Sequence, residues 1–182
     1  ISGLGGGESD RIRTEAGAGE GQQEKEAVGI RSGPAVTQPG DVWLLGDHRL
    51  ICGDALEEST YAVLMNGQEA DVVFADPPYN VKIDGNVCGK GAIHHREFAM
   101  ASGEMSEPEF VDFLSTALSL LERHSCDGSV HFICMDWRHA AEVLLTAKKA
   151  SDTLFNLSVW TKANCRLGSF YRSEDELIYG FI

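Results

Sequence analysis

A carboxylate, two prolines and an aromatic ring directly follow a short apolar run. The run is residues 71–75, and the residues after it are Asp76, Pro77, Pro78 and Tyr79. Four or five apolar residues bounded by turn-forming residues predict an inner strand of an α/β sheet. Because ligands of such sheets bind at the carboxyl ends of the strands, we predict that these four residues lie in a cleft.

These residue types suit the exocyclic amino group of a nucleobase. Such an amino group is a poor nucleophile because its lone pair is conjugated into the ring. Two acceptors that hold its hydrogens would turn the lone pair outward, and the Asp76 carboxylate and a backbone carbonyl in the proline-fixed turn are two such acceptors. The Tyr79 ring offers a face for base stacking, worth roughly 1–3 kcal/mol per base. The pattern predicts a site for a base flipped out of its helix.

The four residues Asp76-Pro77-Pro78-Tyr79 resemble the catalytic motif of the amino-group DNA methyltransferases, in its adenine-type form. Residues 43–55 upstream, and residues 160–162 with residues 168–173 downstream, are also similar to this family. The similarity therefore extends over about residues 40–182.

The resemblance implies methyl transfer from S-adenosyl-methionine to the amino nitrogen of adenine in double-stranded DNA, with the target base flipped. Asp76 and the Pro77 carbonyl would hold the amino group, Pro78 would fix the turn, and Tyr79 would stack on the base. The carboxylate of Asp54 would face the adenosine of the cofactor. From the residues alone, Asp54 could instead cap the following helix, since Asp is favoured at that position.

Two alternatives stay open at the level of the sequence. The first is methylation of the cytosine amino group, although the family more often has Ser at the position of Asp76 in that case. The second is a non-catalytic, nucleic-acid-binding remnant that retains the base pocket without a cofactor site.

Composition restricts the class of protein. Hydrophobic residues make up 43% of the 182 residues, which suits one ordinary domain, and no apolar run approaches the 18 residues of a membrane span. The five cysteines are odd in number and lack Cys-x-x-Cys spacing, so we predict reduced thiols in a cytoplasmic protein. We predict no metal site, and interpret His94 and His95 as solvated side chains.

The net charge of −13 argues against a protein that holds DNA by general electrostatic attraction. Two segments are nevertheless locally basic. We predict that they contact DNA through six side chains: Lys82, Lys90, Arg96, Lys162, Arg166 and Arg172.

The chain divides by composition near residue 40. Residues 1–40 contain ten of the twenty glycines and no aromatic residue, which predicts a disordered linker. In some members of the family a ParB-like module precedes such a linker, and one is possible upstream here. Residues 41–182 would form the catalytic part of a methyltransferase domain.

Hydrophobic periodicity predicts an α/β domain with a largely parallel sheet. Asp136 is predicted to cap a helix, and Ser106 and Glu109 have the spacing of a capping box. The resemblance adds a Rossmann-like methyltransferase sheet, partial and in the permuted order, with an antiparallel last strand. The predicted elements are a hairpin over 42–45 and 48–52, helices over 57–65, 106–121 and from 137, and inner strands over 71–75, 128–135, 156–161 and 176–181.

In the permuted order, the cofactor-binding half with its Gly-rich turn follows the catalytic half, and we expect it beyond Ile182. Residues 1–182 alone should therefore bind S-adenosyl-methionine weakly and transfer no methyl group, because the Gly-rich turn lets the backbone approach the ligand. Calorimetric titration of this fragment with the cofactor checks the prediction. A low-micromolar dissociation constant, roughly −8 kcal/mol, would contradict it.

Overall fold

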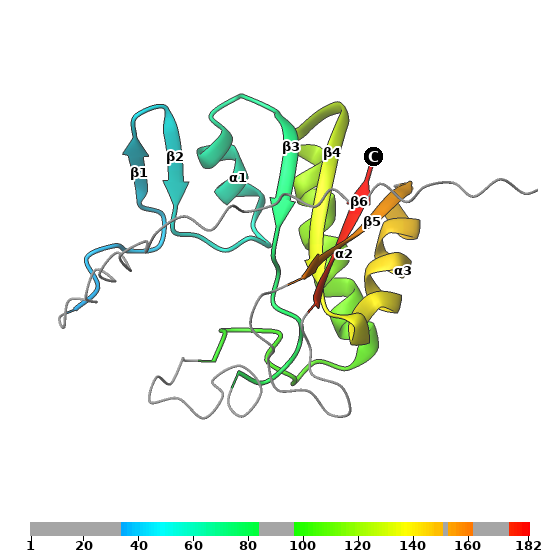
Figure 1. Ribbon diagram of the computed structural model, residues 1–182. Coiled ribbons are helices and arrows are strands. Elements are labelled where there is room, and N and C mark those ends of the chain that lie inside the picture. Colours follow the sequence, from blue (N-terminus) through cyan, green and yellow to red (C-terminus); the bar gives the residue numbers. More distant parts are fainter. Residues whose placement is uncertain (1–33, 84–96, 151–152, 162–174) are drawn as a thin grey trace, which may run out of the picture. The chain divides into compact units, whose positions relative to one another are not determined.

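The computed structural model describes residues 34–83, 97–150, 153–161 and 175–182 (Figure 1). The chain divides into two units, Ile1–Val36 and Thr37–Ile182. Of the first unit only residues 34–36 are described, and they are exposed. The predicted linker over residues 1–40 therefore lies mostly outside the described residues and stays a prediction.

The second unit begins with the predicted hairpin. Strands β1 (Val42–Leu45) and β2 (His48–Ile51) pair antiparallel in a two-stranded sheet of their own. The turn between them has two residues, and Gly46 adopts a φ of 63°, the left-handed region that favours glycine. The hairpin prediction is confirmed.

A four-stranded sheet forms the centre of this unit, in the order β3-β4-β6-β5 (Figure 1). Its strands are β3 (Ala70–Ala75), β4 (Ser125–Met135), β5 (Leu154–Thr161) and β6 (Asp175–Phe181). β3 and β4 are parallel, whereas β6 is antiparallel to both of its neighbours. Three strands thus run in one direction and the last runs in the other, as the resemblance implies. The fold is mixed α/β.

Two strands that the sequence predicts as inner strands are edge strands. β3 lies at one edge, with Val72 60% and Phe74 63% exposed, and β5 lies at the other edge and is exposed throughout. β6 inserts between β4 and β5, which leaves β5 at the edge, whereas β3 pairs only with β4 among the described strands. An apolar run indicates that a strand can be buried, but it does not fix the position of that strand in the sheet.

Three helices accompany the sheet: α1 (Glu58–Met65), α2 (Glu107–Arg123) and α3 (Ala140–Ala150), the last preceded by a 3₁₀ turn, Trp137–His139. Within the described residues, no helix is long and apolar enough to cross a membrane.

The ends of the helices follow the predicted signals. The backbone N–H and the hydroxyl of Ser106 both donate to the Glu109 carboxylate, over 2.8 and 2.6 Å. Asp136 accepts a hydrogen bond from the backbone N–H of His139 over 3.1 Å. Both predicted caps are confirmed, although the first turn after Asp136 is 3₁₀ rather than α-helical.

The core lies between α2, α3 and one face of the sheet. Residues two apart on a strand share a face, so β4 and β6 each direct an alternating set of side chains at the helices. The central buried residues are Phe110 and Leu114 of α2, Ile133 and Met135 of β4, Val143 of α3, and Tyr179 and Phe181 of β6. This packing fixes the position of β6 relative to β4.

Helix α1 is tied to the hairpin and to the end of α2 by side-chain contacts. The Arg49 guanidinium donates to the carbonyls of Leu64 and Val63 over 2.8 and 2.9 Å, at the end of α1 where carbonyls lack helical partners. At the other end of the helix, Glu58 accepts a hydrogen bond from Arg123 over 2.6 Å and contacts His124 over 2.8 Å. These contacts join α1 at one end to β2 and at the other end to the carboxyl end of α2.

Leu114→Ala should lower the free energy of unfolding by about 2–5 kcal/mol, because Leu114 is fully buried and its loss leaves a cavity. Leu145→Ala is a matched control, since Leu145 is 47% exposed on α3 and should change the value by less than about 1 kcal/mol. Urea denaturation followed by circular dichroism measures both. Equal losses in the two variants would contradict the described core.

Candidate functional site

Two carboxylates lie at the carboxyl edge of the central sheet. Asp76 directly follows β3 and Asp136 directly follows β4, and the parallel pairing of Ala75 with Ile133 brings these strand ends to the same edge. This is the edge where α/β folds bind ligands.

The turn after Asp76 is held by Asn80. This residue has a φ of 54°, in the left-handed region that Asn tolerates better than most residues. Its side-chain oxygen accepts hydrogen bonds from the backbone N–H groups of Gly103 and Met105, over 3.0 and 3.2 Å, and its nitrogen donates to the Met105 carbonyl over 2.8 Å. Asn80 thereby attaches the turn to the segment that leads into α2.

The hydroxyl of Tyr79 lies between two carboxylates. It is 2.6 Å from Oδ1 of Asp76 and also hydrogen-bonds Oε1 of Glu176, a residue of β6. The ring is partly buried and packs against the core. Burial, together with the hydrogen bonds to both carboxylates, raises the pKa of the Tyr79 hydroxyl far above its ordinary value. The phenol therefore keeps its proton.

A cavity of about 540 Å³ lies beside the turn. Asp76, Pro77 and Pro78 line it together with Asp54, and the opposite wall is apolar, including Phe113, Ala117 and Leu121 of α2. Its volume falls within the range of small-molecule sites. Three of the four predicted turn residues thus line one cavity, whereas Tyr79 is directed at the carboxylates instead.

Asp54 does not cap α1. The helix begins at Glu58 with Glu57 at the cap position, so Asp54 lies too early in the chain. Its Oδ1 accepts from the backbone N–H of Leu56 over 2.9 Å, the side-chain turn typical of Asp. Tyr61 donates to the Ala55 carbonyl over 3.0 Å and holds the same loop. The cap alternative is therefore wrong, and the carboxylate lies at the cavity with Asp76.

The structure brings together three possible metal ligands that the spacing of residues in the sequence does not predict. One oxygen each of Asp76 and Glu176 and the sulfur of Cys134 lie within 4.8 Å of one another, although the three residues come from separate strands and the turn after β3. Both carboxylates already bond the Tyr79 hydroxyl. The prediction that the protein has no metal site is not tested by this geometry, and His94 and His95 lie outside the described residues.

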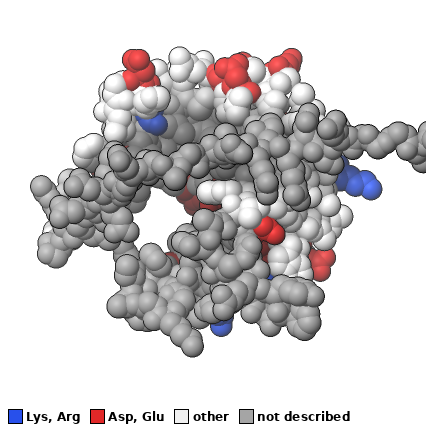
Figure 2. Space-filling view, viewed as in Figure 1, with Lys and Arg blue, Asp and Glu red and all other residues white. Residues whose placement is uncertain are grey.

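The predicted DNA contacts are mostly beyond the described structure. Lys82 is described and exposed. On the face seen in Figure 2, the described surface shows scattered Lys and Arg side chains rather than a basic cluster. The other five residues, Lys90, Arg96, Lys162, Arg166 and Arg172, lie outside the described residues, and their role stays a prediction.

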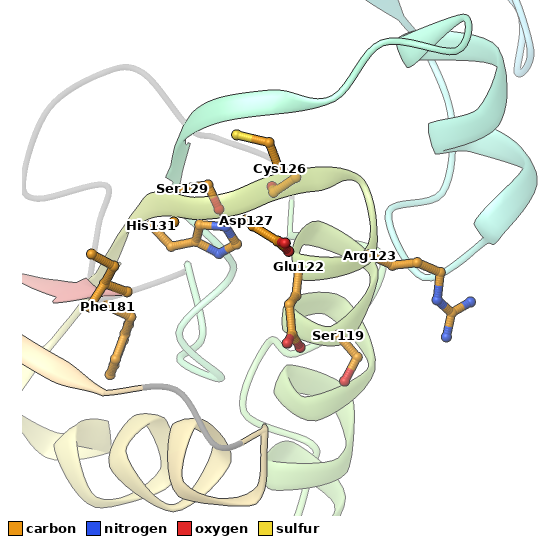
Figure 3. Close-up of a pocket in the computed structure, with 11 residues that line it drawn as sticks. Ser119, Glu122, Arg123, Cys126, Asp127, Ser129, His131 and Phe181 are labelled. Carbon is orange, nitrogen blue, oxygen red and sulfur yellow. Dashed lines mark hydrogen bonds between the residues drawn. The ribbon is translucent and has the colours of Figure 1, made fainter.

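A second pocket, of about 560 Å³, lies at the opposite end of β4 (Figure 3). Its lining is largely polar and includes Glu122, Asp127, Ser129 and His131. Oγ of Ser129 and Nε2 of His131 are 3.1 Å apart. Because Ser129 and His131 are two residues apart on one strand, their side chains share a face. Their contact therefore follows from strand geometry alone. The pocket also lies at the amino end of the strands, away from the usual ligand edge.

No protein-family model matches the chain, and no curated protein sequence does. Among solved structures, the crystal structure of an M1.HpyAVI–SAM complex is similar to this chain, with a TM-score of 0.43 and 14% sequence identity. The match covers 71% of this chain and 51% of that one. The chain thus spans about half the length of that protein.

Proposed function

We propose that this chain is the catalytic part of an S-adenosyl-methionine-dependent DNA methyltransferase that acts on the amino group of adenine. The observation that carries the proposal is the position of the Asp76-Pro77-Pro78 turn. It follows a strand at the carboxyl edge of the sheet and lines a largely apolar cavity together with Asp54. The four-stranded sheet with its reversed last strand would be the corresponding half of a methyltransferase sheet.

The turn would act on the target base through hydrogen bonds. The Asp76 carboxylate and the Pro77 carbonyl accept the two amino hydrogens, which directs the nitrogen lone pair away from the ring. The lone pair would then face the methyl group that the cofactor supplies, and the Asp76 carboxylate, which holds one amino hydrogen, would accept the proton that the nitrogen loses. In a cavity with apolar walls these hydrogen bonds are stronger than in water.

The residues at the cavity fit the cofactor. Bound S-adenosyl-methionine would supply an electrophilic methyl group on its sulfonium. The hydrogen bond from the Leu56 N–H orients the Asp54 carboxylate, which is an acceptor suited to hydroxyl and amino groups of an adenosine. The cavity of about 540 Å³ has room for a group of that size.

The alternatives differ in their products. Methylation of the cytosine amino group needs the same two acceptors, but the family resemblance favours adenine because Asp76 occupies the position where Ser is more common in cytosine enzymes. A non-catalytic remnant would bind nucleic acid and leave it unmodified.

The complete natural protein, incubated with S-adenosyl-methionine and duplex DNA, should form methyladenine, measured by digestion to nucleosides and mass spectrometry. Asp76→Ala should lower the rate by about 10²-fold or more, since one transition-state acceptor is worth about 3 kcal/mol. Asp71→Ala is the matched control, because it removes an exposed carboxylate from the other end of the same strand.

The product analysis separates the candidates. Methylcytosine without methyladenine would contradict the adenine assignment. DNA binding without any methylated nucleoside would favour the remnant. Near-normal methylation by the Asp76→Ala variant would contradict the role of the turn.

Tyr79→Phe should reduce kcat/KM less than Tyr79→Ala does. Phe keeps the ring on which a base can stack, whereas Ala loses a contact worth roughly 1–3 kcal/mol, or about 10–100-fold in rate. Steady-state kinetics on a short duplex compares the two variants. Equal losses would show that the hydroxyl, and not the ring, is the important part of this residue.

A further inference from the structure

Three oxygen atoms meet at Tyr79 with one phenolic proton between them. The hydroxyl lies 2.6 Å from Asp76, three positions before Tyr79, and also hydrogen-bonds Glu176, which lies 97 positions after Tyr79. A phenol has a single proton, so it donates to one ionised carboxylate at a time. The two carboxylates therefore compete for the same donor.

Glu176 reaches this position because β6 is reversed. β3 and β4 end at the site, whereas β6 begins there, and the pairing of Met135 with Leu177 places Glu176 beside the carboxyl end of β4. Glu176 is partly buried and is the second residue of β6, just before the apolar residues that pack inward. The topology thus brings a second carboxylate to the edge that already carries Asp76.

We propose that Glu176 is a positioning residue that takes the Tyr79 hydroxyl bond when Asp76 binds the amino group of the base. The role rests on the proposed function. A carboxylate that already accepts a hydrogen bond from Tyr79 is a weaker acceptor for the substrate. Transfer of that bond to Glu176 leaves Asp76 available to the amino group and keeps the Tyr79 ring in its orientation.

The surroundings of Tyr79 support this assignment. Among the described residues, the titratable groups at the hydroxyl are Asp76 on the turn, Glu176 on β6 and the nearby thiol of Cys134 on β4. Glu176 belongs to β6 and Asp76 to the turn after β3, so different elements hold the two carboxylates. Asp76, Pro77 and Pro78 line the cavity, whereas Glu176 does not, so Glu176 can hold the hydroxyl from outside the cavity wall.

A double-mutant cycle tests the role of Glu176 in the complete natural protein. Glu176→Gln keeps the shape of the side chain and removes its charge, and should lower kcat by about 10-fold, with KM for DNA changed by less than about 3-fold. In a Tyr79→Phe background the same substitution should lower kcat by less than about 3-fold, because the hydroxyl through which Glu176 acts is gone. Asp175→Asn is the matched control, since it removes a neighbouring exposed charge from the same strand.

Thermal unfolding gives a readout that does not require activity. It is measured on the four proteins of the cycle, which are the unsubstituted protein, the two single variants and the double variant. The shift in melting temperature caused by Glu176→Gln should differ by about 2–4 °C between the two backgrounds. Coupling in both kcat and melting temperature supports the proposal. Additive effects on kcat overturn it, whatever the melting temperatures show. A lack of methylation by the unsubstituted protein would instead contradict the proposed function. In that case the melting temperatures still test the coupling of Tyr79 and Glu176, and equal shifts in both backgrounds would overturn it.

Discussion

The candidate site depends on the hydrogen bonding of one phenol to two carboxylates. Tyr79 and Asp76 belong to one turn, but Glu176 comes from the last strand of the sheet, so their meeting requires the reversed direction of β6. A hydrogen bond to a charged group stabilises by about 1.5–3 kcal/mol, and the single phenolic proton can make this bond to either carboxylate. The same bonds hold the Tyr79 ring, and with it the turn, against the core.

The hydrophobic core fixes the position of β6 and thereby the contact between Glu176 and Tyr79. Tyr179 and Phe181 of β6 are buried with Ile133 and Met135 of β4 beneath α2 and α3. Because side chains alternate along a strand, a one-residue slip of β6 would turn its buried set outward. Packing at one end of β6 therefore fixes where Glu176 lies at the other end, and α2 contributes both to this core and to the cavity wall.

Local sequence signals predicted the local structure well. The Gly46 turn, the reach of Glu109 back to Ser106 and the cap at Asp136 depend on residues only a few positions apart, and all three are present. The resemblance also implied the antiparallel last strand correctly. For the site, the same reasoning placed Asp76 and its prolines at the end of a strand.

The failures concern relations between distant parts of the chain. The compositions of β3 and β5 permit burial and predict inner strands, but β3 pairs only with β4 among the described strands, and the insertion of β6 leaves β5 at the other edge. Asp54 has the residue type of a cap, yet the helix begins four residues later. An acidic residue near the start of a strand is common, so the sequence alone predicts no role for Glu176. Its partner lies 97 positions away, and only the fold reveals that contact.

The most direct test of the central claim is a crystal structure of the complete natural protein with a DNA duplex that contains its target adenine. The proposed account predicts a flipped adenine whose amino nitrogen lies within hydrogen-bond distance of the Asp76 carboxylate and the Pro77 carbonyl, with the Tyr79 hydroxyl bonded to Glu176. A base bound elsewhere on the protein, or an amino group without contact to Asp76, would contradict it.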